Sequence, residues 1–294
     1  MIDLHIHTKY SDGTDEVLDI LKKAENNHLD YISITDHNNC NAYDELEQIN
    51  IKDYYNGKII TGIEMNTKIL GIPIEILGYG CNIKNINDKV KEMYLTPKER
   101  NIIEFERLIE KCNDIGIELP KDTKQNYDGS IFTSKYLHNL ITQFPQNSKF
   151  IDTEAWNNSN IFYRKYMSNP NTKLFVNVDD IVPSFEEACN AIKEAGGYIF
   201  IPHIYEYKEN SIKILEEILS KKLIDGIECY YTTFNDKQSQ YLLNICKENN
   251  LFVSGGSDYH GNNKPDVEMG KGKGNLKISN DIINQWIDSI KYIY

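Results

Sequence analysis

The sequence predicts an α/β protein, either a barrel or an open sheet, that carries a helical insertion. Predicted strands and helices alternate in the first 80 residues and again from Ser184 onward, which is typical of a parallel sheet. The stretch between them, residues 96–175, contains no convincing strand. Histidines and acidic residues follow several of the predicted strands, and barrels and open α/β sheets assemble a single active site in this way.

The first part of the chain predicts the order strand, helix, strand, helix, strand. Apolar, β-branched runs indicate the strands, and apolar residues at helical spacing indicate the first helix. The predicted strands are 2–7, 31–35 and 58–66, and the predicted helices are 14–27 and 42–49. Residues 69–80 predict a hairpin that turns at Gly71, Ile72 and Pro73.

The middle of the chain predicts helices alone, and the alternation then resumes. Thr96 and Pro97 have the cap-then-proline pattern of a helix start, and Ser184 with Glu187 forms a capping box. Further helices are predicted near 134–141, 160–167, 212–221, 235–248 and 280–294, and strands at 198–202, 226–230 and 251–254. We therefore expect a barrel domain of residues 1–95 and 176–294, with a helical insertion of residues 96–175.

Composition excludes several classes of function. The chain has 294 residues and a formal net charge of −12, so no basic groove for long duplex nucleic acid is expected. No run approaches the ~18 apolar residues of a membrane span, and no signal peptide is recognisable, so a cytoplasmic location is expected. The six cysteines form no CxxC pair and are expected to be reduced thiols. The sequence carries no signal for an oligomeric state.

Five of the seven histidines lie, with acidic residues, at predicted strand ends. His5 and His7 are two apart on one strand, so their side chains point the same way. Glu64 ends an apolar stretch, where a buried carboxylate is costly unless a cation pairs with it. Asp12 could instead cap a turn or helix, but it directly follows the first strand. The predicted metal ligands are His5, His7, Asp12, His37, Glu64, His203, Asp258 and His260.

Eight ligands are too many for one ion and predict two or three divalent ions. Mixed nitrogen and oxygen donors favour Mn, Fe or Zn over Mg or Ca. Glu64 is expected to be catalytic as a bridging ligand. Asp36 would point away from the ligand face and orient a ligand histidine. Three divalent ions and three carboxylates give the centre a net charge of about +3, which favours an anionic substrate such as a phosphate ester. A water activated by the ions would attack this ester.

Cationic residues outside this set are candidates for substrate binding. Lys135, His138 and Arg164 lie in the insertion, and Lys271 and Lys273 closely follow the last histidine. Insertions on a rigid scaffold often carry binding function, so we expect the insertion to form a wall or lid over the ions. The alternative is that these side chains lie in solvent.

The histidine and acid segments, taken in order, resemble those of a known family. They are Asp3-Leu4-His5-Ile6-His7-Thr8 with Ser11-Asp12-Gly13, Ile34-Thr35-Asp36-His37, Gly62-Ile63-Glu64, Pro202-His203 and Gly256-Ser257-Asp258-Tyr259-His260-Gly261. This set resembles the PHP (polymerase and histidinol phosphatase) family, in its stand-alone phosphoesterase branch. The resemblance implies a distorted seven-stranded β/α barrel with up to three divalent metals. It also implies hydrolysis of small phosphorylated substrates, nucleotides or short oligonucleotides.

The chain departs from the family at three places. Many members have a proline after the histidine of the third motif, whereas here Pro202 precedes His203 and Ile204 follows it. A metal-binding histidine that some members carry after the third strand has no counterpart in residues 78–81, and residues 133–136 replace an Arg-x-His pair of the nucleotide phosphatases. Three alternatives remain: an amidohydrolase-like enzyme acting on C–N bonds, a histidinol-phosphate phosphatase, and a metal-binding protein without turnover. The late pair Asp258 and His260 favours a PHP phosphoesterase over the amidohydrolase.

Overall fold

The chain folds into two compact units, each with its own core. The computed structural model describes residues 1–178, 181–292 and 294. Unit 1 comprises residues 1–93 and 182–294, and unit 2 comprises residues 94–181. The segment expected to be a helical insertion, residues 96–175, lies within unit 2. No described helix is long and apolar enough to span a membrane.

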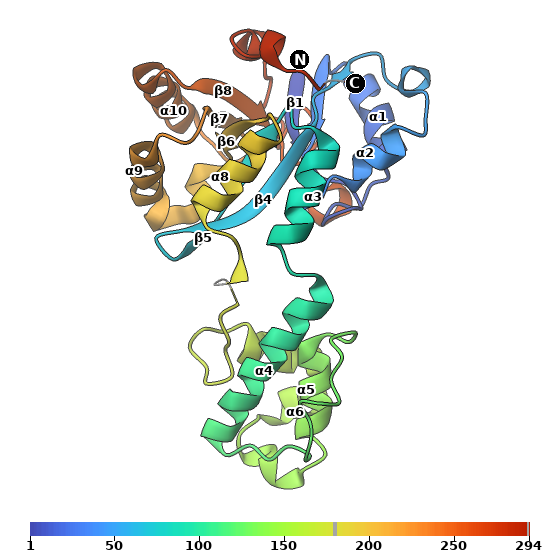
Figure 1. Cartoon of the computed structure of the whole chain (residues 1–294), viewed down its shortest axis with the longest axis vertical. Helices are drawn as coiled ribbons and strands as arrows, with labels where there is room; N and C mark the ends of the chain where they lie inside the picture. Colours follow the sequence, from blue (N-terminus) through green and yellow to red (C-terminus); the bar gives the residue numbers. More distant parts are fainter. Residues whose placement is uncertain (179–180, 293) are drawn as a thin grey trace. The chain divides into compact units, whose positions relative to one another are not determined.

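Unit 1 is built on two sheets (Figure 1). Its described strands are β1 (Ile2–Ile6), β2 (Tyr31–Ile34), β3 (Lys58–Ile59), β4 (Gly62–Ile69), β5 (Ile72–Tyr79), β6 (Tyr198–Ile201), β7 (Gly226–Tyr231) and β8 (Phe252–Gly256). The first sheet has the parallel order β1-β2-β3. The second has the order β4-β5-β6-β7-β8, antiparallel up to β6 and parallel beyond it. The α/β class is confirmed, but the described strands number eight in two sheets, so the seven-stranded barrel is not.

Single bridges join the two sheets at the strand ends. Ile6 pairs with Tyr259, and His37 pairs with Glu64. The first bridge brings the end of β1 beside the end of β8, and the second brings the segment after β2 beside β4. The residues that follow β1, β2 and β8 therefore converge on β4, although they are far apart in the sequence.

The helices of unit 1 bury one apolar face each. They are α1 (Val17–Asn26), α2 (Asn41–Leu46), α3 (Ile83–Met93), α8 (Phe185–Glu194), α9 (Ser211–Lys221) and α10 (Asp236–Asn249). The capping box predicted at Ser184 and Glu187 is present at the start of α8. In α9 the buried residues Ile214, Leu215 and Ile218 recur at helical spacing, as expected of a helix that packs against a sheet.

The hairpin of β4 and β5 turns earlier than predicted. Leu70 and Gly71 form the turn, with φ values of 54° and 72°, and such left-handed pairs make two-residue hairpins. Ile69 therefore pairs with Ile72 rather than with a residue further along. The single strand predicted at 58–66 is also wrong, because it divides into β3 and β4.

The amphipathic helix predicted for residues 280–294 is wrong. The segment contains two short 3₁₀ helices, Asn280–Ile283 and Ile287–Ser289, and residue 293 lies outside the described residues. Trp286 is buried, and its Nε1 donates to the carbonyl of Val253 at 3.1 Å. Ile59 and Tyr294 exchange two backbone hydrogen bonds. These tertiary contacts stabilise short 3₁₀ helices and turns over one continuous α-helix, since helical periodicity alone is a weak determinant.

Unit 2 is helical. Its α-helices in the described residues are α4 (Pro97–Ile115), α5 (Thr133–Ile141), α6 (Thr153–Asn157) and α7 (Ser159–Phe162), and a π-helical turn follows at Tyr163–Met167. The predicted start of α4 is confirmed, with a capping box between Thr96 and Glu99. Phe105, Leu108 and Leu137 belong to a separate buried core.

Candidate metal centre

Five histidine side chains from four strand ends gather in unit 1. His5 lies in β1, and His7, His37, His203 and His260 follow β1, β2, β6 and β8. The centroids of the His7 and His260 rings are 4.1 Å apart, those of His7 and His37 4.7 Å, and those of His5 and His203 5.5 Å. The structure thus brings together all five histidines that the sequence placed at strand ends.

Glu64 lies at the centre of this histidine cluster. Its Oε2 is 3.2 Å from His5 Nε2, 3.1 Å from His7 Nε2 and 3.4 Å from His37 Nδ1. Its Oε1 is 3.0 Å from His203 Nε2. Burial alone would raise the pKa of this carboxyl, but the surrounding imidazoles outweigh burial and hold the pKa well below its ordinary value. Glu64 is therefore an anion that contacts both sides of the cluster.

Asp258 is the second buried carboxylate of the cluster. Its Oδ1 lies 3.5 Å from His5 Nε2, 3.3 Å from His7 Nε2 and 3.3 Å from His260 Nδ1. The backbone of Asp258 has a φ of 57°, and that of His203 a φ of 24°. Left-handed backbone at non-glycine residues is strained and often occurs at functional sites. Here it aims these two side chains into the cluster.

Asp12 lies at the exposed edge of the cluster. Its Oδ1 is 3.1 Å from His260 Nε2, 3.6 Å from His7 Nδ1 and 3.7 Å from His37 Nε2. Burial opposes the charged carboxyl, but the hydrogen bond with His260 and the neighbouring imidazoles lower its pKa. Asp12 does not cap α1, because the residue at that N-cap is Glu16. A ligand role therefore fits Asp12 better than a helix cap.

The donor atoms fit a group of divalent cations. In each of four sets, one ligand atom per residue lies within 4.8 Å of the others. The sets are His7, Asp12, His37 and His260; His5, His7 and Glu64; His5, His203 and Asp258; and His37, Glu64 and Glu75. Among the described residues, the buried His7 Nε2 and His37 Nδ1 atoms make no well-formed hydrogen bond. Ring nitrogens that face carboxylates in this way are suited to cations between them.

Part of the chain matches a known domain pattern. The PHP domain matches residues 3–141, which contain His5, His7, Asp12, His37 and Glu64. A 5′-3′ exoribonuclease of Haemophilus influenzae is 27% identical to it over 294 residues, which are 97% of each chain. This relative and the PHP domain agree with the family that the histidine segments resemble.

Two solved structures share the fold of this chain. A provisionally named metal-dependent phosphoesterase from Bifidobacterium adolescentis has a TM-score of 0.63 and 19% identity, with 97% of this chain and 94% of that chain covered. An amidohydrolase from Chromobacterium violaceum, with bound sulfate and no metal, has a TM-score of 0.61 and 19% identity. The match covers 92% of this chain and 89% of that chain. At this identity the likeness concerns the fold.

Glu75 is a candidate ligand that the sequence analysis missed. Its Oε2 lies 3.4 Å from His203 Nε2, and its Oε1 lies 3.8 Å from His37 Nδ1. Burial and the nearby Glu64 raise the pKa of Glu75 to about 7. In the β4–β5 hairpin Glu75 is opposite Asn66, two residues beyond Glu64 on the same face. Glu75 therefore adds a fourth carboxylate to the cluster, beside those of Asp12, Glu64 and Asp258.

Glu228 supports the ligand histidines from behind and was also missed. Its Oε1 lies 3.1 Å from His5 Nδ1, and its Oε2 accepts a hydrogen bond from the backbone N–H of His203 at 2.8 Å. A carboxylate on the far nitrogen of a ligand imidazole fixes the ring and its tautomer. The signal in the sequence that could have identified Glu228 was its position as an acidic residue inside the apolar strand β7. The neighbouring Cys229 instead packs against Cys246, with 3.6 Å between the sulfurs.

Asp36 does not orient a histidine directly, contrary to the prediction. Its Oδ1 accepts from the backbone N–H of Thr8 at 2.8 Å and from Ser11 Oγ at 2.5 Å, and its Oδ2 accepts from Thr8 Oγ1 at 2.7 Å. Asp36 therefore holds the loop of residues 8–11, which leads to Asp12. Its effect on the cluster passes through that loop, because Ser11 Oγ lies 3.4 Å from His7 Nδ1.

The predicted substrate contacts have mixed outcomes. His138 is buried inside unit 2, where its Nε2 lies 2.9 Å from the carbonyl of Ala155, so its ring is structural and not free for substrate. Lys271 and Lys273 form surface ion pairs, with Glu268 at 3.0 Å and with Asp266 at 2.6 Å. Lys135 and Arg164 are exposed in unit 2.

A cation next to the cluster, Lys264, was missed. Its Nζ contacts Asp258 Oδ2, which also accepts a hydrogen bond from Tyr231 at 2.7 Å. The two oxygens of Asp258 thus have separate partners, the histidines on one side and these donors on the other. Lys264 lies in the loop after His260, four residues beyond that histidine. This closeness to a predicted ligand was the signal in the sequence that could have identified Lys264.

Cation binding should release protons from this centre. Burial disfavours a charged imidazole, but the neighbouring carboxylates of Asp258 and Glu64 outweigh it and raise the pKa of His7 to about 9; Glu64 does the same for His203. Both rings are then protonated at pH 7 without cations, and ligand rings must be neutral. The pKa of His5 is also raised well above its ordinary value, so we expect loading at pH 7 to release at least two protons per chain, and metal affinity to rise from pH 7 to pH 9.

Titration calorimetry of the metal-free protein in buffers of different ionisation enthalpy measures this release. A binding heat that is the same in every buffer would contradict the raised pKa values. The same pKa values imply that the two protonated rings stabilise the metal-free fold below about pH 6.5, and that this contribution disappears as the pH passes about 9.

Proposed function

We propose that this protein is a metal-dependent phosphoesterase that hydrolyses short single-stranded oligonucleotides and nucleotides. The observation that carries the proposal is the convergence of five histidines and four carboxylates. One of these carboxylates, that of Glu64, contacts four of the histidine rings. The name of the Haemophilus influenzae relative, a 5′-3′ exoribonuclease over nearly the whole length, supports RNA as the substrate and the 5′ end as the point of attack.

The residues that would hold the cations are those of the four sets described above. Divalent cations at such a site supply an activated water and stabilise negative charge on a transferring phosphoryl group. Asp12, Glu64, Glu75 and Asp258 bring four negative charges, so three cations leave the centre at about +2. A local positive charge in a chain of net charge −12 directs a phosphate ester to this centre rather than to the rest of the surface.

Within this proposal the surrounding side chains have separate tasks. Glu228 fixes the His5 ring, and Asp36 fixes the loop that carries Asp12. Lys264 and Tyr231 hold the outer oxygen of Asp258, which leaves its other oxygen directed at the histidines. Ligands held in this way keep the cation positions fixed while substrate binds.

A substrate panel tests the proposal. With Mn²⁺, a 5′-phosphorylated ten-nucleotide RNA should be shortened stepwise from its 5′ end, with mononucleotides as products on a sequencing gel. The panel includes mononucleotides, nucleoside bisphosphates, histidinol phosphate and cyclic amides. A chain that hydrolyses an amide and no phosphoester would overturn the proposal in favour of an amidohydrolase. If histidinol phosphate alone is hydrolysed, the proposal of a phosphoesterase stands, but the proposed oligonucleotide substrate is wrong.

A further inference from the structure

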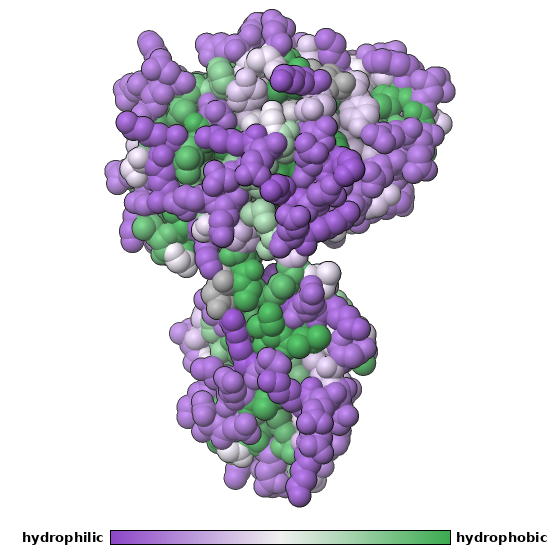
Figure 2. Space-filling view, viewed as in Figure 1, coloured by the Kyte–Doolittle hydropathy of each residue, from purple (hydrophilic) through white to green (hydrophobic). Residues whose placement is uncertain are grey.

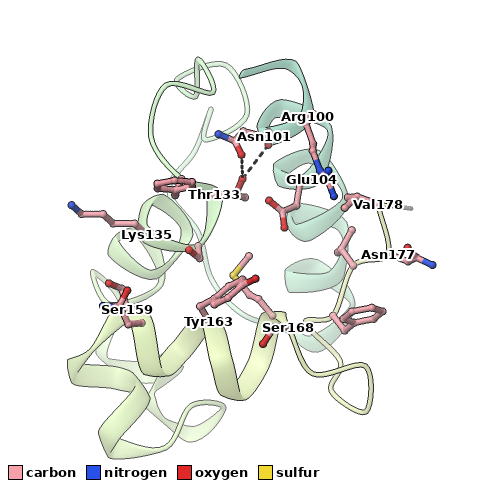
Figure 3. Close-up of a pocket in the computed structure, with 16 residues that line it drawn as sticks. Arg100, Asn101, Glu104, Thr133, Lys135, Ser159, Tyr163, Ser168, Asn177 and Val178 are labelled. Atoms are coloured by element: carbon pink, nitrogen blue, oxygen red, sulfur yellow. Dashed lines mark hydrogen bonds between the residues drawn. The ribbon is translucent and has the colours of Figure 1, made fainter. Parts of the chain in front are cut away.

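Unit 2 contains a cavity that the metal centre does not use. Its volume is about 650 Å³, within the range of small-molecule sites. Its lining comes from α4, the start of α5, the helical segment after residue 158 and residues 175–178. Figure 3 shows Tyr163 and Glu104 directed at this space and Lys135 at its edge. All of the lining residues belong to unit 2.

Two aromatic rings at this cavity are unusually exposed. Phe132 is 78% exposed and Tyr163 is 47% exposed, and both line the cavity. Leaving a large apolar side chain in water forgoes the favourable free energy of burial, so a Phe this exposed is unusual unless it serves binding. Hydrophobic residues reach the surface of unit 2 on the face shown in Figure 2. Exposed aromatic rings beside a cavity are typical of platforms on which nucleobases stack.

Two cations line the same cavity without acidic partners. Arg100 and Lys135 are exposed, and no carboxylate pairs with either among the residues that the structure describes. Other cations of unit 2 are paired, such as Lys124 with Glu106 at 2.9 Å and Lys165 with Glu154 at 2.8 Å. Unpaired cations next to aromatic rings suit a phosphate–base–phosphate strand better than an apolar peptide.

The overall charge of unit 2 also permits binding to a nucleic acid. Residues 94–181 contain eleven Lys and Arg and twelve Asp and Glu, a formal charge of −1 out of −12 for the whole chain. The acidity is therefore concentrated in unit 1. A polyanion therefore encounters little net repulsion at unit 2. Inside the cavity, the negative charge of Glu104 repels a phosphate, so a base is favoured in the cavity and phosphates at its rim.

We propose that this cavity binds one nucleotide of a single-stranded RNA substrate. The base stacks on Phe132 and Tyr163, and the flanking phosphates contact Arg100 and Lys135. The inference rests on the proposed function for its choice of RNA, and it adds a binding site in a unit whose described residues belong to none of the ligand sets. Such a site would give the enzyme affinity for a strand in addition to the phosphate at the metal centre.

Direct binding tests this site separately from catalysis. The whole protein, as isolated, is titrated into a fluorescein-labelled phosphorothioate oligouridylate of ten nucleotides, and anisotropy gives Kd. A gel after each titration establishes that the probe is intact. We expect Phe132→Ala and Tyr163→Ala each to raise Kd at least about fivefold, the lower end for loss of one stacked base. Phe132→Trp should retain or improve binding.

The matched controls are exposed residues outside the cavity. Ile131→Ala removes a side chain that is 47% exposed next to Phe132, and Tyr241→Ala removes a tyrosine of α10 that is 42% exposed. Both should bind like the wild type. If Phe132→Ala binds as tightly as Ile131→Ala, or if Phe132→Trp binds as poorly as Phe132→Ala, the stacking site is refuted.

Salt dependence separates the cations from the rings. For a single strand, each lost phosphate contact lowers the slope of log Kd against log salt by about 0.7. Lys135→Ala and Arg100→Ala should each show this decrease, whereas Phe132→Ala should leave the slope unchanged. Lys121→Ala, an exposed lysine of unit 2 outside the cavity lining, is the charge-matched control and should leave both Kd and slope unchanged. An equal decrease in Lys121→Ala would mean diffuse attraction and would overturn the site.

The outcomes for the two proposals differ. Hydrolysis of p-nitrophenyl phosphate, which has no base and no strand, is measured on the Phe132 and Tyr163 variants and should be unchanged. If the wild type binds the oligouridylate through Phe132 but hydrolyses no phosphoester, the proposed function fails and the binding site stands. If RNA is degraded and none of the four cavity variants changes Kd, the binding site fails and the proposed function stands.

Discussion

Glu64→Gln should lower the rate of phosphoester hydrolysis by at least about a thousandfold. The substitution keeps the shape of the side chain but removes the one carboxylate that faces four histidines, at 3.0 to 3.4 Å. Single-turnover kinetics with saturating Mn²⁺ and the best substrate of the panel measures the effect, and circular dichroism checks the fold. A variant with near wild-type turnover would show that Glu64 lies outside the metal shell.

Glu75→Gln is the matched comparison for that experiment. It makes the same chemical change in a carboxylate that faces two of the histidines, at 3.4 and 3.8 Å, and its side chain is 30% exposed. We therefore expect a smaller loss of rate than for Glu64→Gln. Equal losses in the two variants would mean that Glu64 has no special bridging position.

Replacing His5 and His7 together by Ala should remove at least one cation and the stability that it supplies. The wild type should bind at least two equivalents of Mn, Fe or Zn per chain, measured by elemental analysis after reconstitution. A ligand at about 100 times its Kd stabilises a fold by roughly 2.7 kcal/mol, so the metal-dependent rise in Tm should shrink by roughly 5–10 °C.

The difference in Tm with and without chelator is the relevant quantity, because removing two buried rings also lowers the stability of the metal-free fold. His28→Ala, outside every ligand set, is the control and should keep the full metal-dependent rise. A wild type that never binds more than one ion would refute the multinuclear centre, whatever the variant does.

The histidine cluster was predictable because each member follows an apolar run of the chain. Strand ends on one side of a parallel sheet meet in space, so the position of His37 or His203 in the sequence already implied its position in the fold. The same reasoning could not place the tail. Its apolar residues have helical spacing, but Trp286 and Tyr294 find partners in Val253 and Ile59, which no local pattern reveals.

Glu75 shows how one misplaced turn hides a functional residue. A turn at 71–73 would have paired Glu75 with Ile69 and directed it to the face opposite Glu64. The observed turn at Leu70 and Gly71 pairs it with Asn66 instead, three residues away from Ile69, and a register shift by an odd number of residues exchanges the two faces of a strand. Asp36 and His138 show the opposite error, in which a functional role was predicted for a structural residue. Their polar side chains are instead engaged in hydrogen bonds with backbone and hydroxyl groups.

The bridge between Ile6 and Tyr259 has a consequence for biosynthesis. The backbone N–H of His7 donates to the carbonyl of Tyr259, and the N–H of Tyr259 donates to the carbonyl of His5, so β1 is completed by a segment that is synthesised about 250 residues after it. A nascent chain displays His5, His7 and His37 long before Asp258 and His260 exist. Cation capture by the complete centre therefore has to await the synthesis of residues 258–260, and until then the early ligands offer only an incomplete set of donors.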